Sequence, residues 1–439
     1  MRLRLSRFGI QPDSQTGQSD AKSVQQSGRH FLQVPGPTPI PERILAAMCR
    51  QMLDHRGPQF QELAHRVLSG IRTIFRTKGP VILFPSSGTG ALEAALVNTL
   101  SPGDCVLFAG TGQIDLLWAT MARDLGLMPI VIQTDWRSGA DAAQVEEHLR
   151  ADVGRDIKAV CVVHNETSTG ARTRIEEIRA AMDAASHPAL LLVDAVSSLA
   201  VMDYRHDDWR VDVSISGSQK GLMVPPGLSF NAVSEKALVA SRQPTLPRCY
   251  WSWKSMLDQN ASGFFPFTPP ISLLYGLAES ITMLHEFGLE NVFARHERHA
   301  EAVRRAVKAW GLEIWCRDAR SYSPGVTVVS MPGGHDADAF RRLVLDRFNV
   351  SLAMGLNKLA GKAFRFGHLG YTNDATIVGA LAAVEMGLEL ARVPHDAGGV
   401  DVALRFLTQG DRGSEVRTTE RLLAVKRVGS GNLFAQASI

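Results

Sequence analysis

Short apolar segments alternate with segments of helical periodicity through the first two thirds of the chain. The apolar segments are rich in Val, Ile, Leu and Phe and lie at 81–84, 106–109, 130–133, 159–163, 189–193 and 211–214. Between them, residues 91–100 and 173–184 have the apolar spacing of amphipathic helices. This alternation predicts an α/β fold with a doubly wound, mostly parallel sheet that is covered by helices on both faces.

The pattern changes after Pro269 and Pro270. A long helix is expected at 271–288, and a smaller α+β domain is expected to follow it, with helices at 292–310 and 336–348, a strand at 326–331 and a loop-rich segment at 354–370. We therefore predict a flexible arm at 1–30, a large domain at 31–290, a small C-terminal domain at 291–408 and a polar tail at 409–439.

Composition indicates a soluble protein of enzyme size. The chain has 439 residues, of which 45% are hydrophobic and 21% charged, and its net charge is +3. This charge is too small and too dispersed to predict a nucleic-acid partner. No apolar run approaches the roughly 20 residues that span a bilayer, so we expect no membrane partner.

The cysteines and the N-terminus bear on location. The five cysteines are odd in number and widely spaced, which is typical of reduced thiols in the cytoplasm, and no CxxC pair indicates a metal site. The first seven residues are Arg-rich and precede the first acidic residue, Asp13, which weakly resembles an organelle presequence. We expect a cytoplasmic protein, with the presequence as the alternative.

Two residues suggest a cofactor. Lys220 lies in a turn of small residues at 216–221, and Asp194 directly follows the apolar segment at 189–193. A lysine in a poorly solvated pocket can lose its proton near neutral pH and form a Schiff base, while a buried aspartate can keep a pyridine nitrogen protonated. This pair is a signature of pyridoxal phosphate sites. Taken singly, Lys220 also fits a surface turn and Asp194 a helix cap.

Polar segments follow three of the predicted strands. Residues 85–91 read PSSGTGA and open a helix, whose free N–H groups and hydroxyls can bind phosphate, although an ordinary N-cap has the same pattern. Residues 164–170 read HNETSTG. Because ligands of doubly wound sheets bind beyond the carboxyl ends of strands, we expect Ser87, Thr167 and Asp194 to converge on one crevice.

Arg365 is the candidate for substrate binding. It alternates with apolar residues in the segment 361–368, which reads GKAFRFGH. An arginine on such a strand can present its planar guanidinium to a carboxylate, but a half-exposed strand arginine would give the same spacing.

Taken together, the motifs resemble the class V aminotransferases, and within them the serine–glyoxylate and alanine–glyoxylate branch. The resemblance covers about Leu32 to Leu407, in the order of the family, and rests on PGPTPIP, His55-Arg56, SSGTGALEAAL, HNETSTG, VDAVSSL, SGSQKG, PPG, FPFTPP, NVFARH and FRFGHLG. It implies pyridoxal 5′-phosphate bound by a homodimer of two-domain subunits with fold-type I architecture.

The resemblance also implies roles for single residues. Lys220 would form the Schiff base and move the substrate Cα proton, and Asp194 would pair with the pyridine nitrogen. Arg365, with the backbone around Gly36, would hold the substrate carboxylate. The remaining cofactor contacts would come from Ser87, Gly88, Thr89 and Gln219 near the phosphate, Thr167 at the ring hydroxyl, Ile114 and Val196 on the two ring faces, and Thr268 at the phosphate of the neighbouring subunit.

Two positions depart from the family pattern. Family members usually place an aromatic ring over the pyridine where this chain has Ile114, and some relatives have a tyrosine near the phosphate where it has Phe265. An aliphatic contact loses a stacking contribution of roughly 0.5–1.5 kcal/mol, which puts cofactor affinity and ring tilt in question.

The resemblance favours ping-pong transamination between L-serine and glyoxylate, which gives hydroxypyruvate and glycine. Alanine, ureido or amino-sulfonate donors are alternatives on the same scaffold. A lyase or desulfurase is another, and a desulfurase would need a thiol on a mobile loop, for which only Cys249 is suitably placed. The last alternative is a cofactor-binding relative without turnover.

Overall fold

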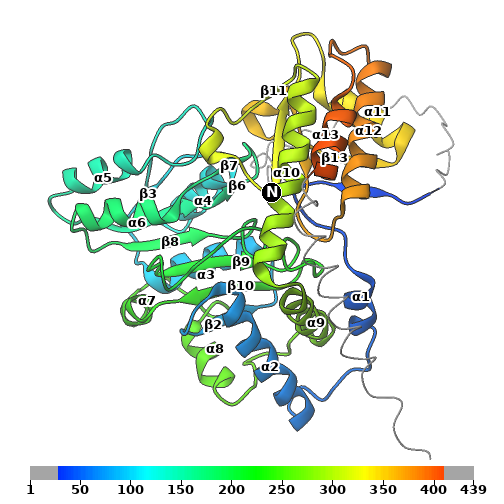
Figure 1. The fold of residues 1–439 in the computed structure, drawn as a ribbon. Coiled ribbons are helices and arrows are strands. Elements are labelled where there is room, and N and C mark those ends of the chain that lie inside the picture. The colour runs from blue at the N-terminus through cyan, green and yellow to red at the C-terminus, as the bar shows by residue number, and fades with distance from the viewer. Residues whose placement is uncertain (1–27, 410–439) are drawn as a thin grey trace, which may run out of the picture.

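The structure is a computed structural model that describes residues 28–409. Its first sheet has seven strands (Figure 1). Their order is β2 (Val81–Phe84), β10 (Ser229–Val233), β9 (Val213–Gly217), β8 (Leu190–Asp194), β5 (Ile157–Val163), β3 (Cys105–Phe108) and β4 (Met128–Val131). All neighbours are parallel except β10, which runs antiparallel to β2 and β9. The prediction of a doubly wound, mostly parallel sheet is therefore confirmed.

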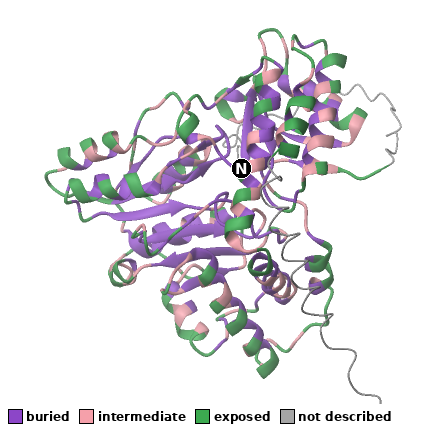
Figure 2. Ribbon diagram, in the orientation of Figure 1, coloured by how far each residue is buried: buried purple, intermediate pink, exposed green. Residues whose placement is uncertain are grey.

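Every residue of β8, β9 and β10 is buried, because helices cover the centre of this sheet on both faces. The helices of this part are α1 (Glu42–Met48), α2 (Pro58–Phe75), α3 (Gly88–Thr99), α4 (Gln113–Asp124), α5 (Ala142–Ala151), α6 (Ile175–Ala184), α7 (Glu235–Ala240), α8 (Trp253–Asn260) and α9 (Ile271–Phe287). A short hairpin, β6 (Asn165–Glu166) with β7 (Ala171–Arg172), follows β5. Figure 2 shows buried residues throughout the sheet and exposed residues on the outer helix faces.

The second sheet has five strands. It lies towards the C-terminal end of helix α10 (Leu289–Ala309), away from the first sheet. Its order is β1 (Phe31–Gln33), β13 (Val350–Met354), β14 (Ala363–Gly367), β12 (Val326–Ser330) and β11 (Glu313–Ile314). Helices α11 (Ala337–Phe348), α12 (Asp374–Leu390) and α13 (Gly399–Gln409) pack with α10 around this sheet, and two short 3₁₀ turns lie at Ala319–Ser321 and Asn357–Leu359. Its core, which includes Trp310, Phe364 and Leu381, is separate from that of the first sheet.

Two features differ from the expected organisation. Strand β1 pairs in parallel with β13, so Phe31–Gln33 joins the second sheet although the sequence placed residues 31–290 in the large domain. Helix α13 includes Gln409, where we expected the polar tail to begin. The domain boundaries themselves stay a prediction, and the arm before residue 28 and the tail after 409 lie outside the described residues.

Within residues 28–409, no helix has the length and apolar character needed to cross a membrane. The same part of the chain contains no cluster of His, Cys, Asp and Glu side chains that could hold a metal ion. All five cysteines are free thiols, and Cys249 is exposed.

Candidate active site

The carboxyl ends of β2, β5 and β8 bring the expected polar segments together. Gly88, at the start of α3, packs so closely on Val196 that a Cβ at residue 88 would lie 2.7 Å from Val196 Cγ2. The loop after β5 reaches the second sheet, because the carbonyl oxygen of Thr167 accepts a hydrogen bond of 3.1 Å from Arg365 Nη1. Residues of both sheets therefore meet at this edge of the first sheet, and the region between Val196, Thr167 and Arg365 is the candidate crevice.

Asp194 is the last residue of β8 and is buried. Its Oδ1 accepts a hydrogen bond of 2.8 Å from the backbone N–H of Val196. Burial raises the pKa of Asp194 to about 7, and the nearby carboxylate of Glu166 adds to this effect while Lys220 opposes it. A cationic group beside Asp194 would therefore strongly favour the ionised carboxylate.

Lys220 lies in the turn after β9 and is half-buried. Its Nζ donates a hydrogen bond to the carbonyl oxygen of Pro35. Burial lowers the pKa of Lys220 to about 8, with Arg365 adding to the effect and Asp194 opposing it. Both protonation states of the amine are accessible near neutral pH, as a nucleophile and proton carrier requires.

The turn that carries Lys220 is held by Thr38. The N–H of Thr38 donates to the carbonyl oxygen of Gln219, and its hydroxyl donates to that of Lys220, both over 3.1 Å. Thr38 lies in the PGPTPIP segment, but the sequence pattern predicts no such role for it. Its role depends on a contact between residues 182 positions apart, which no local pattern reveals.

A cradle for an anion lies at the start of α3. Ser87 and Thr89 are exposed, and the side chain of Ser87 does not cap the helix, so its hydroxyl is available. Gln219 Oε1 is buried and has no hydrogen-bond partner among the described residues. A Cβ on Gly217 would lie 2.9 Å from this oxygen and 3.5 Å from Gly88 N, so the amide lies beside the helix start. A flip of that amide would present its NH₂ group to a phosphate.

Arg365 lies in the middle of β14 and is buried. Its Nε donates to the carbonyl oxygen of Met354 over 2.6 Å, and Nη1 donates to Thr167 as described above. No carboxylate within residues 28–409 forms an ion pair with it. Burial lowers the pKa of Arg365 to about 10, so it remains a cation with further N–H groups to offer a carboxylate.

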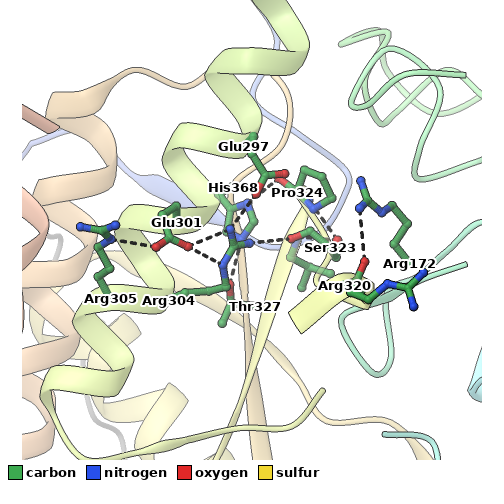
Figure 3. Close-up of polar contacts among 12 residues, drawn as sticks. Arg172, Glu297, Glu301, Arg304, Arg305, Arg320, Ser323, Pro324, Thr327 and His368 are labelled. Carbon is green, nitrogen blue, oxygen red and sulfur yellow. Dashed lines mark hydrogen bonds and ion pairs between the residues drawn. The ribbon is translucent and has the colours of Figure 1, made fainter. Parts of the chain in front are cut away.

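A polar cluster fixes the strand that carries Arg365 (Figure 3). His368, just after β14, is fully buried, and its Nδ1 donates over 2.8 Å to the carbonyl oxygen of Pro324 while Nε2 accepts from Thr327 over 3.0 Å. Arg304 of α10 contacts the same loop through the carbonyl oxygen of Ser323, at 3.4 Å. Because the N–H of Ser323 donates to Gly170, the cluster ties β12 and β14 to the loop of Thr167.

The remaining predicted residues differ in their surroundings. Ile114, in the first turn of α4, is half-buried, and its N–H donates to Glu166 over 3.1 Å. Thr268 is exposed. Phe265 is buried and packs edge-on against Phe60, with ring centroids 6.0 Å apart, so its ring belongs to the core. The functional roles of all these residues stay predictions.

Comparison with known proteins identifies the family. The model of the family "Aminotransferase class-V" matches residues 30–359. The chain is 46% identical to serine–glyoxylate aminotransferase of Methylorubrum extorquens, over 83% of this chain and 92% of the relative. It is 42% identical to L-aspartate–glyoxylate aminotransferase of Paracoccus denitrificans, again over 83% of this chain and 92% of the relative.

A solved structure agrees with this assignment. The pyridoxamine–pyruvate aminotransferase of Mesorhizobium loti superposes with a TM-score of 0.81 and 29% sequence identity, covering 86% of this chain and 97% of the other. Such similarity extends through both sheets, since the coverage includes most of residues 28–409. The chain belongs to the class V aminotransferases, and it is an aminotransferase of fold-type I architecture.

Proposed function

We propose that this enzyme transfers the amino group of L-serine to glyoxylate, with pyridoxal 5′-phosphate as its cofactor, and so forms hydroxypyruvate and glycine. One observation carries the proposal: the buried Asp194 and the buried Arg365 both lie close enough to Lys220 to act on the pKa of its amine. The 46% identity to a serine–glyoxylate aminotransferase supports the choice of substrates.

The residues in the crevice fit the cofactor. The amide of Gln219, once flipped to present its NH₂ group, and the hydroxyl of Ser87 suit its phosphate, together with the N–H groups at the start of α3. Asp194 suits the pyridine nitrogen, because a cation there would stabilise the buried carboxylate. When bound, pyridoxal phosphate supplies an aldehyde that links to amines and a ring that accepts an electron pair.

Lys220 moves the proton in both halves of the reaction. Its amine has a pKa of about 8, so near neutral pH it can take the proton from the substrate Cα and later return it. Pro35 and Gly36 lie against this amine and limit where it can move. Asp194 holds the proton on the ring nitrogen throughout.

Arg365 orients both substrates. Serine and glyoxylate each carry a carboxylate, so one guanidinium with free N–H groups serves the amino donor and the amino acceptor in turn. Because Met354 and Thr167 already hold two of its donors, the guanidinium is fixed before the substrate arrives.

A donor series tests the substrate assignment. The enzyme is incubated with glyoxylate and, separately, with L-serine, L-alanine, L-aspartate, a ureido donor and an amino-sulfonate donor, and glycine formation is followed. We expect the largest kcat/KM with L-serine. A larger value with L-aspartate would instead favour the activity named for the Paracoccus denitrificans relative.

The homodimer and the cytoplasmic location are further parts of the proposal. Thr268 is exposed in the single chain, in agreement with a position that reaches the phosphate of a neighbouring subunit. Sedimentation of the holoenzyme tests the dimer. A Thr268→Ala variant that binds pyridoxal phosphate as tightly as the wild type would argue against the shared site.

A further inference from the structure

Glu166 is a fully buried carboxylate whose four hydrogen bonds join two walls of the crevice. Its Oε2 accepts from the backbone N–H groups of Ile114 and Asp115, at 3.1 and 3.4 Å. Its Oε1 accepts from the backbone N–H and the hydroxyl of Ser168, at 2.9 and 2.7 Å. The start of α4 is thereby tied to the loop that carries Thr167.

These bonds replace an ordinary helix cap. The residue before α4 is Gly112, which has no side chain to offer, and the first N–H groups of a helix need external acceptors. The hydroxyl of Ser168 accepts the N–H of Gln113 over 2.9 Å, so Ser168 and Glu166 together satisfy three consecutive donors. A Cβ on Gly112 would lie 2.4 Å from Glu166 Cγ, so the glycine permits the close approach.

The buried position of the Glu166 carboxylate is energetically unfavourable. Burial raises the pKa of Glu166, and its charge in turn raises the pKa of the buried Asp115 and Asp194. Its charge also favours the cationic form of Arg365. A cap for α4 alone could be made by an uncharged side chain such as Ser or Asn, without this repulsion.

We propose that Glu166 is a positioning residue of the cofactor crevice, which fixes Ile114 against the Thr167 loop so that the two segments grip the ring between them. This inference rests on the proposed cofactor. Glu166 itself does not touch the ring; it acts through the backbone of Ile114 and through Ser168.

The test measures cofactor affinity of the apoenzyme, by fluorescence titration with pyridoxal phosphate, together with thermal stability. The variant is Glu166→Gln, which keeps the shape but replaces one acceptor by a donor. The matched control is Glu385→Gln, because Glu385 also accepts two backbone N–H groups, of Gly398 and Val400, but between helices of the second core.

We expect both variants to lose thermal stability and only Glu166→Gln to lose affinity, with its Kd for pyridoxal phosphate raised about tenfold or more and that of the control changed by less than about twofold. The circular dichroism of the bound cofactor should also change in Glu166→Gln alone. A Glu166→Gln protein that binds pyridoxal phosphate within about twofold of the wild type would overturn the proposal.

A second variant covers the case in which Glu166→Gln does not fold. Ser168→Ala removes one donor to Glu166 and the acceptor for Gln113, and it should raise the Kd about threefold or more. Unchanged affinity there would contradict the proposal. If the wild-type apoenzyme itself does not bind pyridoxal phosphate, the proposed cofactor fails, and the role of Glu166 fails with it.

Discussion

Gly36 and Lys220 lie in direct contact, so closely that a Cβ atom at residue 36 would fall 2.4 Å from Lys220 Nζ and 2.3 Å from Cδ. Gly36 also has a φ of 104°, in the region that favours glycine. The neighbouring carbonyl oxygen of Pro35 accepts a hydrogen bond from the same amine. The segment that follows β1 therefore forms one wall around the reactive lysine.

A Gly36→Ala substitution should displace the lysine. The added methyl group overlaps with the Lys220 side chain, so we expect kcat to fall by about 10²-fold or more, as misplaced reactive groups do. Steady-state kinetics on folded, cofactor-loaded protein checks this. Gly333→Ala is the matched control, since a Cβ there meets no atom within 4 Å. A kcat near the wild-type value would contradict the described contact.

Lys220→Ala should remove turnover. We expect kcat to fall by about 10⁴-fold or more, because both the covalent link and the proton carrier are lost. Lys236→Ala serves as the control, since Lys236 donates to Ala189 and Asp212 away from the carboxyl ends of the strands. Mass spectrometry after borohydride reduction should find the cofactor attached at residue 220 in the wild type alone. Turnover within about tenfold of the wild type would rule out this role.

Arg365→Lys should weaken substrate binding more than cofactor binding. A lysine keeps the charge but lacks the planar fork, so we expect KM for serine and for glyoxylate to rise by about 10–100-fold, with the Kd of pyridoxal phosphate nearly unchanged. Arg341→Lys is the control, because Arg341 also donates to a strand carbonyl, that of Leu352. Equal KM values in wild type and Arg365→Lys would mean that Arg365 does not hold the substrate carboxylate.

Asp194 should make the stability of the apoenzyme depend on pH. Its folded pKa of about 7 lies above the ordinary value of 3.8, so the folded protein holds the proton of this carboxyl group more tightly than the unfolded chain does. The stabilising contribution is complete below about pH 4 and is lost progressively as the pH rises to about 7, at up to about 1.4 kcal/mol per pH unit. Asp115 is shifted in the same direction.

An Asp194→Asn apoenzyme should therefore lose less stability than the wild type between pH 4 and 7, in chemical denaturation followed by circular dichroism. Bound pyridoxal phosphate should reduce the same slope in the wild type, because the ring cation favours the ionised carboxylate. Identical slopes for wild type and Asp194→Asn would mean that the carboxyl group is not perturbed as described.

Ile114→Phe should tighten cofactor binding. An aromatic ring at the start of α4 can stack on the pyridine, a contribution of roughly 0.5–1.5 kcal/mol, so we expect the Kd to fall by up to about tenfold. Ile114 is half-buried, so its side chain is not enclosed on every side by the core. Titration of the apoenzyme measures this change. Weaker binding would indicate that the crevice is shaped around the aliphatic side chain.

Much of the first sheet could be predicted from sequence, because parallel strands buried on both faces read as short apolar runs. The segment 81–84 corresponds to β2 in full, whereas 211–214 begins two residues before β9 and overlaps it only at Val213 and Ser214. Strand β1 escaped prediction because it has only three residues and its partner β13 lies more than 300 positions away. Helix α12 was not predicted, because its largely apolar sequence has little amphipathic period.

The crevice was partly predictable for a similar reason. Ser87 and Thr167 follow strands of one sheet and Asp194 ends another, and strand ends of a parallel sheet meet at one edge. Glu166 stood in the HNETSTG motif without a role, because nothing in a sequence tells a buried carboxylate from an exposed one. Thr38 also had no expected role, and Gly36 was expected only at the substrate carboxylate, because both reach Lys220 only through the folded chain.

The most direct measurement is the absorbance spectrum of the purified holoenzyme, recorded before and after addition of L-serine and then of glyoxylate. We expect a visible band of the bound cofactor that bleaches with serine and returns with glyoxylate, since Lys220 and Asp194 would then carry both half-reactions. A protein that shows no such band even after incubation with pyridoxal phosphate, or a band that neither substrate changes, would contradict the proposed transamination.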